Sequence, residues 1–554
     1  MDKRKILNLI VCSGLTMMML LTGCGNKEVV ENKTGTGVPT TAAVDPMAKY
    51  SPAVTVSVIE ATSSTRKYPE GDSYESNVWT KGYEQDLGIK FEYQWVVDQA
   101  QFNDKLNVSI ASDDLPEMMN IPYNQFYKLA KAGKLLDISQ LFTKNANALI
   151  KENAEKANKF AFNNCTVNGK LYGIAKDPEI TTGGFLWIRD DWMKKLNLTA
   201  PKTADDVIKI AKAFVEQDPD GNGKKDTFGL GMSKDIWGGG MDMVGFANAY
   251  HAYPKIWIQK NGKLEYGSIQ PELKTALQKM QGMYKDGLLD KEFTLKGAWD
   301  KAPDTIKASQ TGMIYGPGWV PYWVLTDVIK DNPQATWTPY PIPSADNNPA
   351  IYQLDARVNT VACLTTKAKN PEALLKMMNF AVDKLYGEKT LERKYHDENG
   401  IETFFFSKID GTVPEPFNWC RQPAIKVTEA LKTGDATKLN PEQKGYYDRA
   451  KVWQDSKDTS GWGSFAIFGP GGTSLLGNEA YDKKAYFLNK FTGPDTTTMI
   501  SKKSNIDSKE NEIFTNIIMG ASIDEFDKWV KYFNDQGGVL ITKEVNEWWD
   551  AQAK

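Results

Sequence analysis

Residues 54–59 read VTVSVI and residues 89–95 read IKFEYQW, two runs in which apolar side chains alternate with other residues. Alternation with a period of two predicts β-strands. Residues 78–87 between the runs predict a helix, and an apolar stripe from Phe102 to Ile110 predicts a second one. This order of strands and helices indicates a parallel α/β sheet, which binds ligands beyond the carboxyl ends of its strands.

The length of the chain indicates more than one lobe. About 500 residues follow residue 50, and this exceeds the size at which a single hydrophobic core divides. Further helices are predicted where Thr203 with Asp206 and Ser522 with Glu525 form capping boxes, and where Asn370 and Pro371 open an apolar stripe. The sequence therefore predicts an α/β protein whose C-terminal third is mainly helical.

The first 50 residues predict export and a lipid anchor. A basic start, Lys3 to Lys5, precedes an apolar run that ends in Leu-Thr-Gly-Cys at residues 21–24. This pattern indicates a secretory signal over residues 1–23, and the apolar run falls short of the roughly 20 residues that cross a bilayer. The motif resembles a bacterial lipobox, which implies lipidation of Cys24. Residues 24–50 are polar and predict a flexible linker that holds the protein at the extracytoplasmic face of the membrane.

The composition limits the classes of function. A net charge of −3 disfavours nucleic acid as a partner. Two histidines provide little for histidine-dependent catalysis, so we expect a protein that is not an enzyme. Cys165, Cys363 and Cys420 are too few and odd in number for a disulfide framework. Packing is expected to account for most of the 16 tryptophans, and a few of them are expected to line a ligand cleft.

Residues 218–226, DPDGNGKKD, predict a structural calcium site. Calcium prefers six to eight hard oxygen ligands, and an EF-hand loop supplies them at alternating positions. Gly223 permits the sharp turn at position 6, whereas Gly229 stands where an EF-hand has its bidentate glutamate. The next residues predict a strand, which indicates an EF-like loop outside an EF-hand. The expected ligands are Asp218, Asp220, Asn222, Asp226 and the backbone carbonyl of Lys224.

Several stretches resemble the extracellular solute-binding proteins of family 1, the group that includes maltodextrin-binding proteins. They occur in the order expected for that family: KLNVSIASDDLPEMM (105–119), VNGKLYGI (167–174), FLWIRDDWMKKL (185–196), KASQTGMIYGPGWVPYW (307–323) and residues 362–382. The EF-like loop and the C-terminal KEVNEWW are similar to a subgroup of large lipoproteins that includes alginate-oligosaccharide-binding proteins. Thr227 stands where the alginate binders carry a further acidic calcium ligand.

The resemblance implies a two-lobed periplasmic-binding-protein-like fold of type II with a hinge. It implies a monomer that captures an oligosaccharide and delivers it to the permease subunits of an ABC transporter. Residues 51–178 plus 340–365 are expected to form the N-terminal lobe, and residues 179–339 plus 366–554 the C-terminal lobe. Closure of the two lobes on the ligand is the motion expected of such a protein.

Candidate ligand-binding residues are aromatic side chains beside glycine or proline and polar side chains after strand-like runs. An indole face covers the C–H face of a sugar ring, and polar groups fix the hydroxyl groups. The aromatic candidates are Trp319, Tyr322, Trp323, Trp237, Trp419 and Trp462, and the polar candidates are Glu60, Asn120, Asp177 and Arg357. Trp187, Trp192 and Trp529 lie within regular elements and are expected in the core.

Two other classes of function remain open at this stage. A secreted glycoside hydrolase needs two carboxylates at a set separation, and the 70 acidic residues of the chain do not exclude such a pair. A lipoprotein that binds peptides, or one that acts as a surface adhesin, has the same export signal. Release of new reducing ends would indicate the hydrolase, and a calorimetric screen of soluble ligands separates the binding proteins.

Overall fold

The structure is a computed structural model that describes residues 45–63, 66–156, 160–176, 184–355, 357–387, 390–396, 398, 401–414 and 421–552. Cys24, Asp177, Trp419 and Cys420 lie outside the described residues. Within the described part, no helix combines the length and the apolar character that a membrane crossing needs.

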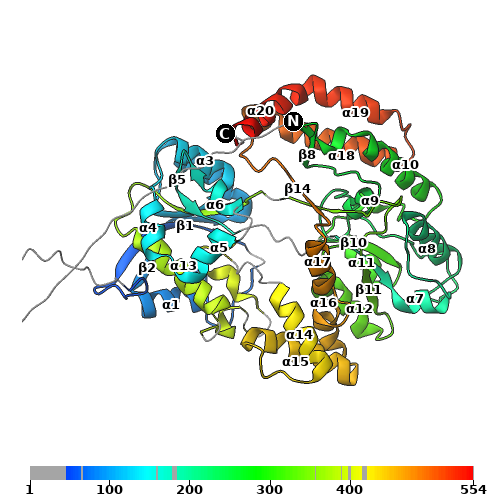
Figure 1. The fold of residues 1–554 in the computed structure, drawn as a ribbon, viewed down its shortest axis with the longest axis horizontal. Helices are drawn as coiled ribbons and strands as arrows, with labels where there is room; N and C mark the ends of the chain where they lie inside the picture. The colour runs from blue at the N-terminus through cyan, green and yellow to red at the C-terminus, as the bar shows by residue number, and fades with distance from the viewer. Residues whose placement is uncertain are drawn as a thin grey trace, which may run out of the picture. The chain divides into compact units, whose positions relative to one another are not determined.

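Two separate hydrophobic cores define two lobes, whose elements form two groups in Figure 1. The first core contains residues between Val56 and Ala175 and between Val358 and Val413. Its elements are β1 (Val54–Thr62), α1 (Val78–Gly82), β2 (Ile89–Asp98), α2 (Phe102–Ala111), β3 (Met118–Pro122), α3 (Tyr123–Lys131), α4 (Ser139–Asn145), α5 (Ala148–Lys156), α6 (Phe160–Asn164), β4 (Thr166–Val167), β5 (Lys170–Leu171), β6 (Gly173–Ile174), β13 (Thr360–Leu364) and α13 (Glu372–Tyr386).

The second core contains residues between Phe185 and Tyr352 and between Trp453 and Val545. Its elements before the return crossing are β7 (Phe185–Arg189), α7 (Asp190–Lys195), α8 (Ala204–Glu216), α9 (Val244–Ala249), β8 (Trp257–Lys260), β9 (Lys263–Tyr266), α10 (Pro271–Lys285), α11 (Ala302–Lys307), β10 (Met313–Gly316), α12 (Thr326–Asp331), β11 (Trp337–Tyr340) and β12 (Tyr352–Leu354).

The C-terminal third is mainly helical, as the sequence predicts. It contains α14 (Arg421–Thr433), α15 (Pro441–Ser456), α16 (Trp462–Phe468), α17 (Thr473–Asp482), β14 (Tyr486–Leu488), α18 (Thr497–Ile518), α19 (Glu525–Phe533) and α20 (Val539–Gln552). A small apolar cluster joins α14, α15 and α16, while Trp453 of α15 and Trp462 of α16 belong to the second core. These helices therefore extend the second lobe.

The predicted parallel arrangement is correct for β1 and β2, which pair in parallel along their length. The three-stranded sheets are antiparallel. In the first lobe β13 lies between β3 and β6, and in the second lobe β7 lies between β10 and β11. The chain crosses back from the second lobe to the first before β13, and β13 runs antiparallel to its neighbours β3 and β6. No local alternation reports such a long-range pairing, so the predicted parallel arrangement does not extend to these two sheets.

The helix α13 packs in the first lobe, and this changes the predicted boundaries of the lobes. The expected C-terminal lobe contained residues 366–554, but residues 373–413 contribute side chains to the first core. Conversely, Ile342 and Tyr352 lie in the second core, although residues 340–365 were expected in the N-terminal lobe. We therefore propose that the return crossing lies between residues 352 and 358, and that the first lobe continues to residue 413.

Candidate functional site

Three indoles gather on the second lobe. The rings of Trp299 and Trp319 are stacked, with centroids 6.0 Å apart and an interplanar angle of 15°. The ring of Trp323 lies 5.1 Å from Trp299 and 6.4 Å from Trp319. The side chains of Trp299 and Trp319 remain 62% and 38% exposed. Such a cluster presents flat apolar faces to solvent at one place on the surface.

Glycines in two loops bring the indoles together. Trp319 follows the end of β10, and a β-carbon at Gly240 would lie only 2.1 Å from the six-membered ring of Trp323. A β-carbon at Gly316 would lie 2.8 Å from the carbonyl oxygen of Gly240. The loop after Trp237 therefore packs directly against the segment that carries the predicted aromatic residues, because neither glycine has a side chain.

A cavity of about 810 Å³ opens beside Tyr322 and takes its walls from both lobes. Tyr322 comes from the π-helical turn that follows Trp319, and its hydroxyl group lies 2.9 Å from the Ser464 hydroxyl. The first lobe contributes segments around residues 66, 393 and 401–406, and α15 contributes the remainder. The lining residues are Arg66, Lys67, Tyr322, Arg393, His396, Ile401, Glu402, Phe404, Phe405, Phe406, Glu442, Tyr446 and Arg449.

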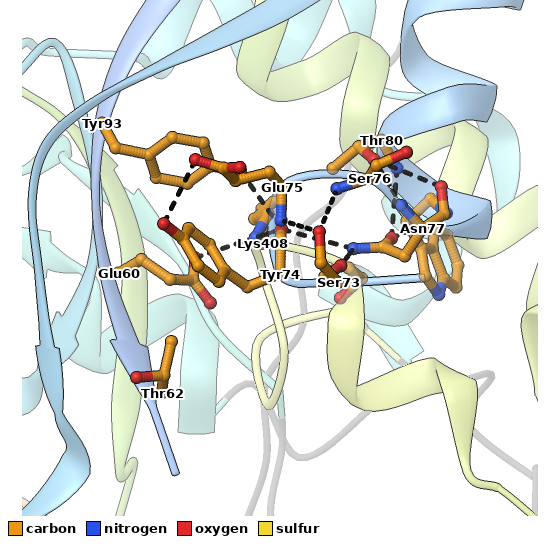
Figure 2. A network of polar contacts seen from close by, with 12 residues as sticks. Glu60, Thr62, Ser73, Tyr74, Glu75, Ser76, Asn77, Thr80, Tyr93 and Lys408 are labelled. Carbon is orange, nitrogen blue, oxygen red and sulfur yellow. Dashed lines mark hydrogen bonds and ion pairs between the residues drawn. The ribbon is translucent and has the colours of Figure 1, made fainter. Parts of the chain in front are cut away.

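The predicted polar residues Glu60 and Asn120 contact one segment of the first lobe. Lys408 donates hydrogen bonds to Glu60 Oε2 at 3.1 Å and to the carbonyl of Tyr74 at 2.6 Å, as Figure 2 shows. Asn120 Nδ2 donates to the carbonyl of Asp410 at 2.7 Å, and Asn120 Oδ1 has no hydrogen-bond partner among the described residues. Residues 408 and 410 follow the segment 401–406 that contributes to the cavity, but neither Glu60 nor Asn120 is among the described residues that line it.

Burial shifts the pKa of two charged groups in this segment of the first lobe. The Lys408 side chain is buried, and burial lowers its pKa although the carboxylate of Glu60 opposes this effect. The ring of Tyr93 lies 5.1 Å from the Lys408 ammonium group. Burial also raises the pKa of Asp410 to about 6, against the opposing charge of Arg66. Lys408 is therefore a buried cation that the Glu60 carboxylate and the Tyr93 ring stabilise.

Asp242 is a partly buried acid in the glycine-rich loop of the second lobe. It lies two residues after Gly240, and its Oδ1 accepts a hydrogen bond from the backbone N–H of Val244 at 2.9 Å. Burial raises the pKa of Asp242 to about 7, and the hydrogen bond from Val244 only partly offsets this. Sequence reasoning missed both Asp242 and Trp299. The available signal for Asp242 was the run of glycines at 238–240 before it, whereas Trp299 follows only a single glycine, Gly297.

The other predicted residues lie away from the cavity. Trp462 begins α16 and is only 3% exposed, so its burial in the second core argues against the predicted ligand contact. Trp237 packs edge-on against Phe514, with ring centroids 6.1 Å apart. Arg357 pairs with Asp355, and it borders a separate small cavity. Trp187, Trp192 and Trp529 are buried in the second core, as predicted.

The EF-like loop has a donor set that suits a hard cation. Asn222 Nδ2 donates to Asp220 Oδ2 at 2.7 Å and to Asp226 Oδ1 at 3.1 Å, and these contacts bring the two carboxylates to one amide. Asp218 Oδ2 accepts from the N–H of Gly223, whereas the buried Asp218 Oδ1 has no hydrogen-bond partner within the described ranges. A carboxylate oxygen without a hydrogen-bond partner, beside two other acidic side chains, is the type of ligand that calcium prefers.

Two features limit the donor set. Across the described residues, no group of three histidine, cysteine, aspartate or glutamate side chains converges closely enough to hold a metal ion. The hydroxyl of Thr227, which follows the loop, donates to the carbonyl of Phe214 at 2.7 Å and so anchors the loop to α8. Calcium in this loop is therefore a proposal that draws on backbone and amide oxygens as well as on carboxylates.

Two separately packed lobes that share a cavity, with exposed indoles on one lobe, define a two-lobed binding protein. Residues 67–384 match the model of the bacterial extracellular solute-binding proteins, more than half of the chain. The chain belongs to this family, whose members are binding proteins and not enzymes.

Two curated relatives and one solved structure illustrate the family. The chain is 32% identical over 216 residues to the polygalacturonan/rhamnogalacturonan-binding protein YtcQ of Bacillus subtilis. The matched residues make up 38% of this chain and 41% of that relative. It is also 31% identical over 240 residues to lipoprotein LipO of the same organism, and this match covers 43% of this chain and 46% of LipO. The chain thus matches less than half the length of either relative.

The solved structure is an EF-hand mutant of FusA, an ABC-transporter substrate-binding protein of S. pneumoniae, in complex with fructo-nystose. It has a TM-score of 0.59 and 18% sequence identity, and the match covers 90% of this chain and 99% of that structure. This likeness shows that the two-lobed fold extends over nearly the whole chain.

Proposed function

We propose that this protein captures an oligosaccharide outside the cell and delivers it to the permease of an ABC importer. The observation that carries the proposal is the exposed, stacked pair Trp299 and Trp319. Three residues after Trp319, Tyr322 lines a cavity that takes its walls from both lobes. An indole face buries the apolar face of a sugar ring without a charge, and polar side chains at the cavity fix the hydroxyl groups. The names of the relatives, which refer to pectic and fructose polymers, support a sugar ligand.

The proposal includes a lipid anchor at Cys24 and a structural calcium ion. The lipobox-like sequence and the similarity to a lipoprotein support the anchor. The EF-hand of FusA and the orphaned Asp218 Oδ1 support the calcium ion. Asp218, Asp220, Asn222, Asp226 and the carbonyl of Lys224 would hold this ion. It would neutralise the acidic loop and join α8 to the segment that follows.

Calorimetric titration of the described domain with a panel of oligosaccharides tests the sugar ligand. We expect one oligosaccharide per protein molecule, with a Kd of about 1 μM, which corresponds to about −8 kcal/mol. A parallel assay for reducing ends should show no increase, because a binding protein leaves the glycan intact. New reducing ends would instead indicate a glycoside hydrolase, and binding of peptides but of no sugar would favour the peptide-binding alternative.

The Trp319→Ala variant is expected to weaken oligosaccharide binding about 30-fold, a loss of about 2 kcal/mol. Trp319 provides a large exposed ring face, and its removal takes away the stacking surface while the core stays intact. The Trp549→Ala variant on α20 is the matched control, since it deletes the same side chain from another partly buried surface. Equal Kd values for the two variants in the same titration would contradict the assigned role.

Removal of calcium by a chelator is expected to lower the melting temperature by a few degrees. An ion that binds only the folded protein at a hundred times its Kd stabilises it by about 2.7 kcal/mol. Differential scanning fluorimetry with calcium and with chelator measures the shift. The Asp220→Asn variant should show a smaller shift, because it weakens the donor set. An identical melting temperature of the wild-type protein under both conditions would exclude a structural calcium ion.

A further inference from the structure

The described residues that line the cavity carry an excess of positive charge, although the chain as a whole carries a net charge of −3. Among them are four cationic side chains and two carboxylates, a formal excess of two positive charges with histidine neutral. The cations are Arg66, Lys67, Arg393 and Arg449, and the carboxylates are Glu402 and Glu442. A concentration of one sign of charge in a concave site raises the local concentration of ligands of the opposite sign.

Two of the guanidinium groups converge from different lobes. A β-carbon placed on Gly445 would lie 3.4 Å from Arg393 Nη1 and 3.8 Å from Arg449 Nη1. The two nitrogens are therefore separated by no more than the sum of these distances. Arg393 precedes Tyr395 of the first core, whereas Arg449 lies on α15 of the second lobe. A single carboxylate between two guanidinium groups at such a separation can accept hydrogen bonds from both.

The side chain of Arg449 is already oriented for an anion. Its Nε donates to Ser464 Oγ at 3.1 Å, and its guanidinium carbon lies 5.3 Å from the centroid of the Tyr446 ring. The same Ser464 hydroxyl contacts the Tyr322 hydroxyl. A fixed guanidinium group loses less entropy when it binds a planar, two-oxygen anion, which is the geometry that arginine recognises best.

The buried carboxylate of Glu442 belongs to the wall of the cavity. Its Oε1 accepts a hydrogen bond from the Tyr446 hydroxyl at 2.8 Å. Burial raises the pKa of the Tyr322 hydroxyl, while the charges of Arg449 and Arg393 act in the opposite direction. Both arginines therefore act on Tyr322, which follows Trp319 by three residues in the chain.

We propose that this cavity receives a carboxylate carried by the sugar, so that the preferred ligand is an oligosaccharide that contains uronic acid residues. The proposal rests on the proposed function as a sugar-binding protein and names its ligand class. The carboxylate lies between Arg393 and Arg449, and a neighbouring ring of the same chain stacks on Trp319. The cavity pairs the charge of the ligand with one arginine from each lobe, so the charged ligand also favours the closed arrangement of the lobes.

The test compares trigalacturonate with its methyl ester, which has the same rings and no charge. Calorimetry on the wild-type protein should show that the ester binds about 10- to 100-fold more weakly, as expected for the loss of charge-assisted hydrogen bonds. Arg449→Gln and Arg393→Gln should each weaken binding of the acid about 10-fold or more and leave binding of the ester within about 2-fold. Two variants from different lobes keep the test valid if one of them folds poorly.

Lys451→Gln is the matched control for charge. It removes one positive charge from the same helix, α15, at an exposed residue that pairs with Asp455 at 2.7 Å. This control should leave both affinities within about 2-fold. If the ester binds as tightly as the acid, or if a sugar phosphate binds more tightly than the uronate, the uronate proposal is overturned while the sugar-binding function stands. If neither trigalacturonate nor neutral fructo-oligosaccharides bind, the proposed function fails as well.

Discussion

The Asp191→Ala variant is expected to lose about 3 kcal/mol of unfolding free energy, because it leaves a buried guanidinium group without its counterion. Arg189, at the end of β7, is 1% exposed, and its Nε and Nη2 donate to the two oxygens of Asp191 at 2.8 and 2.6 Å. The remaining contacts of the guanidinium group include the ring of Trp192 at 4.6 Å and Ser309 Oγ at 3.3 Å from Nη1.

Chemical unfolding monitored by tryptophan fluorescence measures the loss. The Asp205→Ala variant is the control, since Asp205 is an exposed acid that pairs with Lys279 at 3.5 Å and should contribute less than about 1 kcal/mol. Replacement of both partners, Arg189→Met with Asp191→Leu, should recover most of the loss, because apolar side chains need no counterion. Equal stabilities of the Asp191→Ala and Asp205→Ala variants would show that the buried pair does not stabilise the second lobe.

The stability of the protein is expected to fall by about 2–4 kcal/mol between about pH 4 and pH 7 because of Asp242. The pKa of this carboxyl group is about 7 in the folded protein, well above its ordinary value of 3.8. The folded state therefore binds the proton more tightly than the unfolded chain does. Acidic conditions favour folding through this group, and the contribution is lost as the pH rises to the folded pKa.

The Asp242→Asn variant removes the titration and keeps an acceptor for the N–H of Val244. Urea unfolding of both proteins at about pH 4.5 and about pH 8 should show that the variant gains stability relative to the wild type at the higher pH. The comparison within each pH cancels the contributions of other acids. A difference between the two proteins that is the same at both pH values would contradict the assigned burial of Asp242.

Local patterns predicted the elements whose residues contact near neighbours in the chain. The alternating runs at residues 54–59 and 89–95 lie in β1 and β2. The predicted capping box is confirmed, because Thr203 Oγ1 accepts from the N–H of Asp206 and Asp206 Oδ2 from that of Thr203. The capping box expected after Ser522 was wrong. The Ser522 hydroxyl pairs with Asp524 instead, and α19 begins at Glu525.

The candidate site was predicted only in part. Trp319 and Trp323 were candidates because they follow a strand end beside glycines, and the structure places their rings in one cluster, with Trp319 exposed and Trp323 partly buried. Glycines around Trp462 suggested a loop, but the residue begins a helix that packs into the core. Arg393 and Arg449 are 56 positions apart and come from different lobes. Their convergence depends on the crossings of the chain between lobes, which no local spacing encodes.

A crystal structure of the described domain with a bound oligosaccharide tests the central claim most directly. We expect the sugar in the cavity beside Tyr322, with one ring against the indole of Trp319 and polar contacts from residues of both hydrophobic cores. A sugar held on the outer surface of one lobe, with Trp319 untouched and the cavity filled only by solvent, would contradict the account.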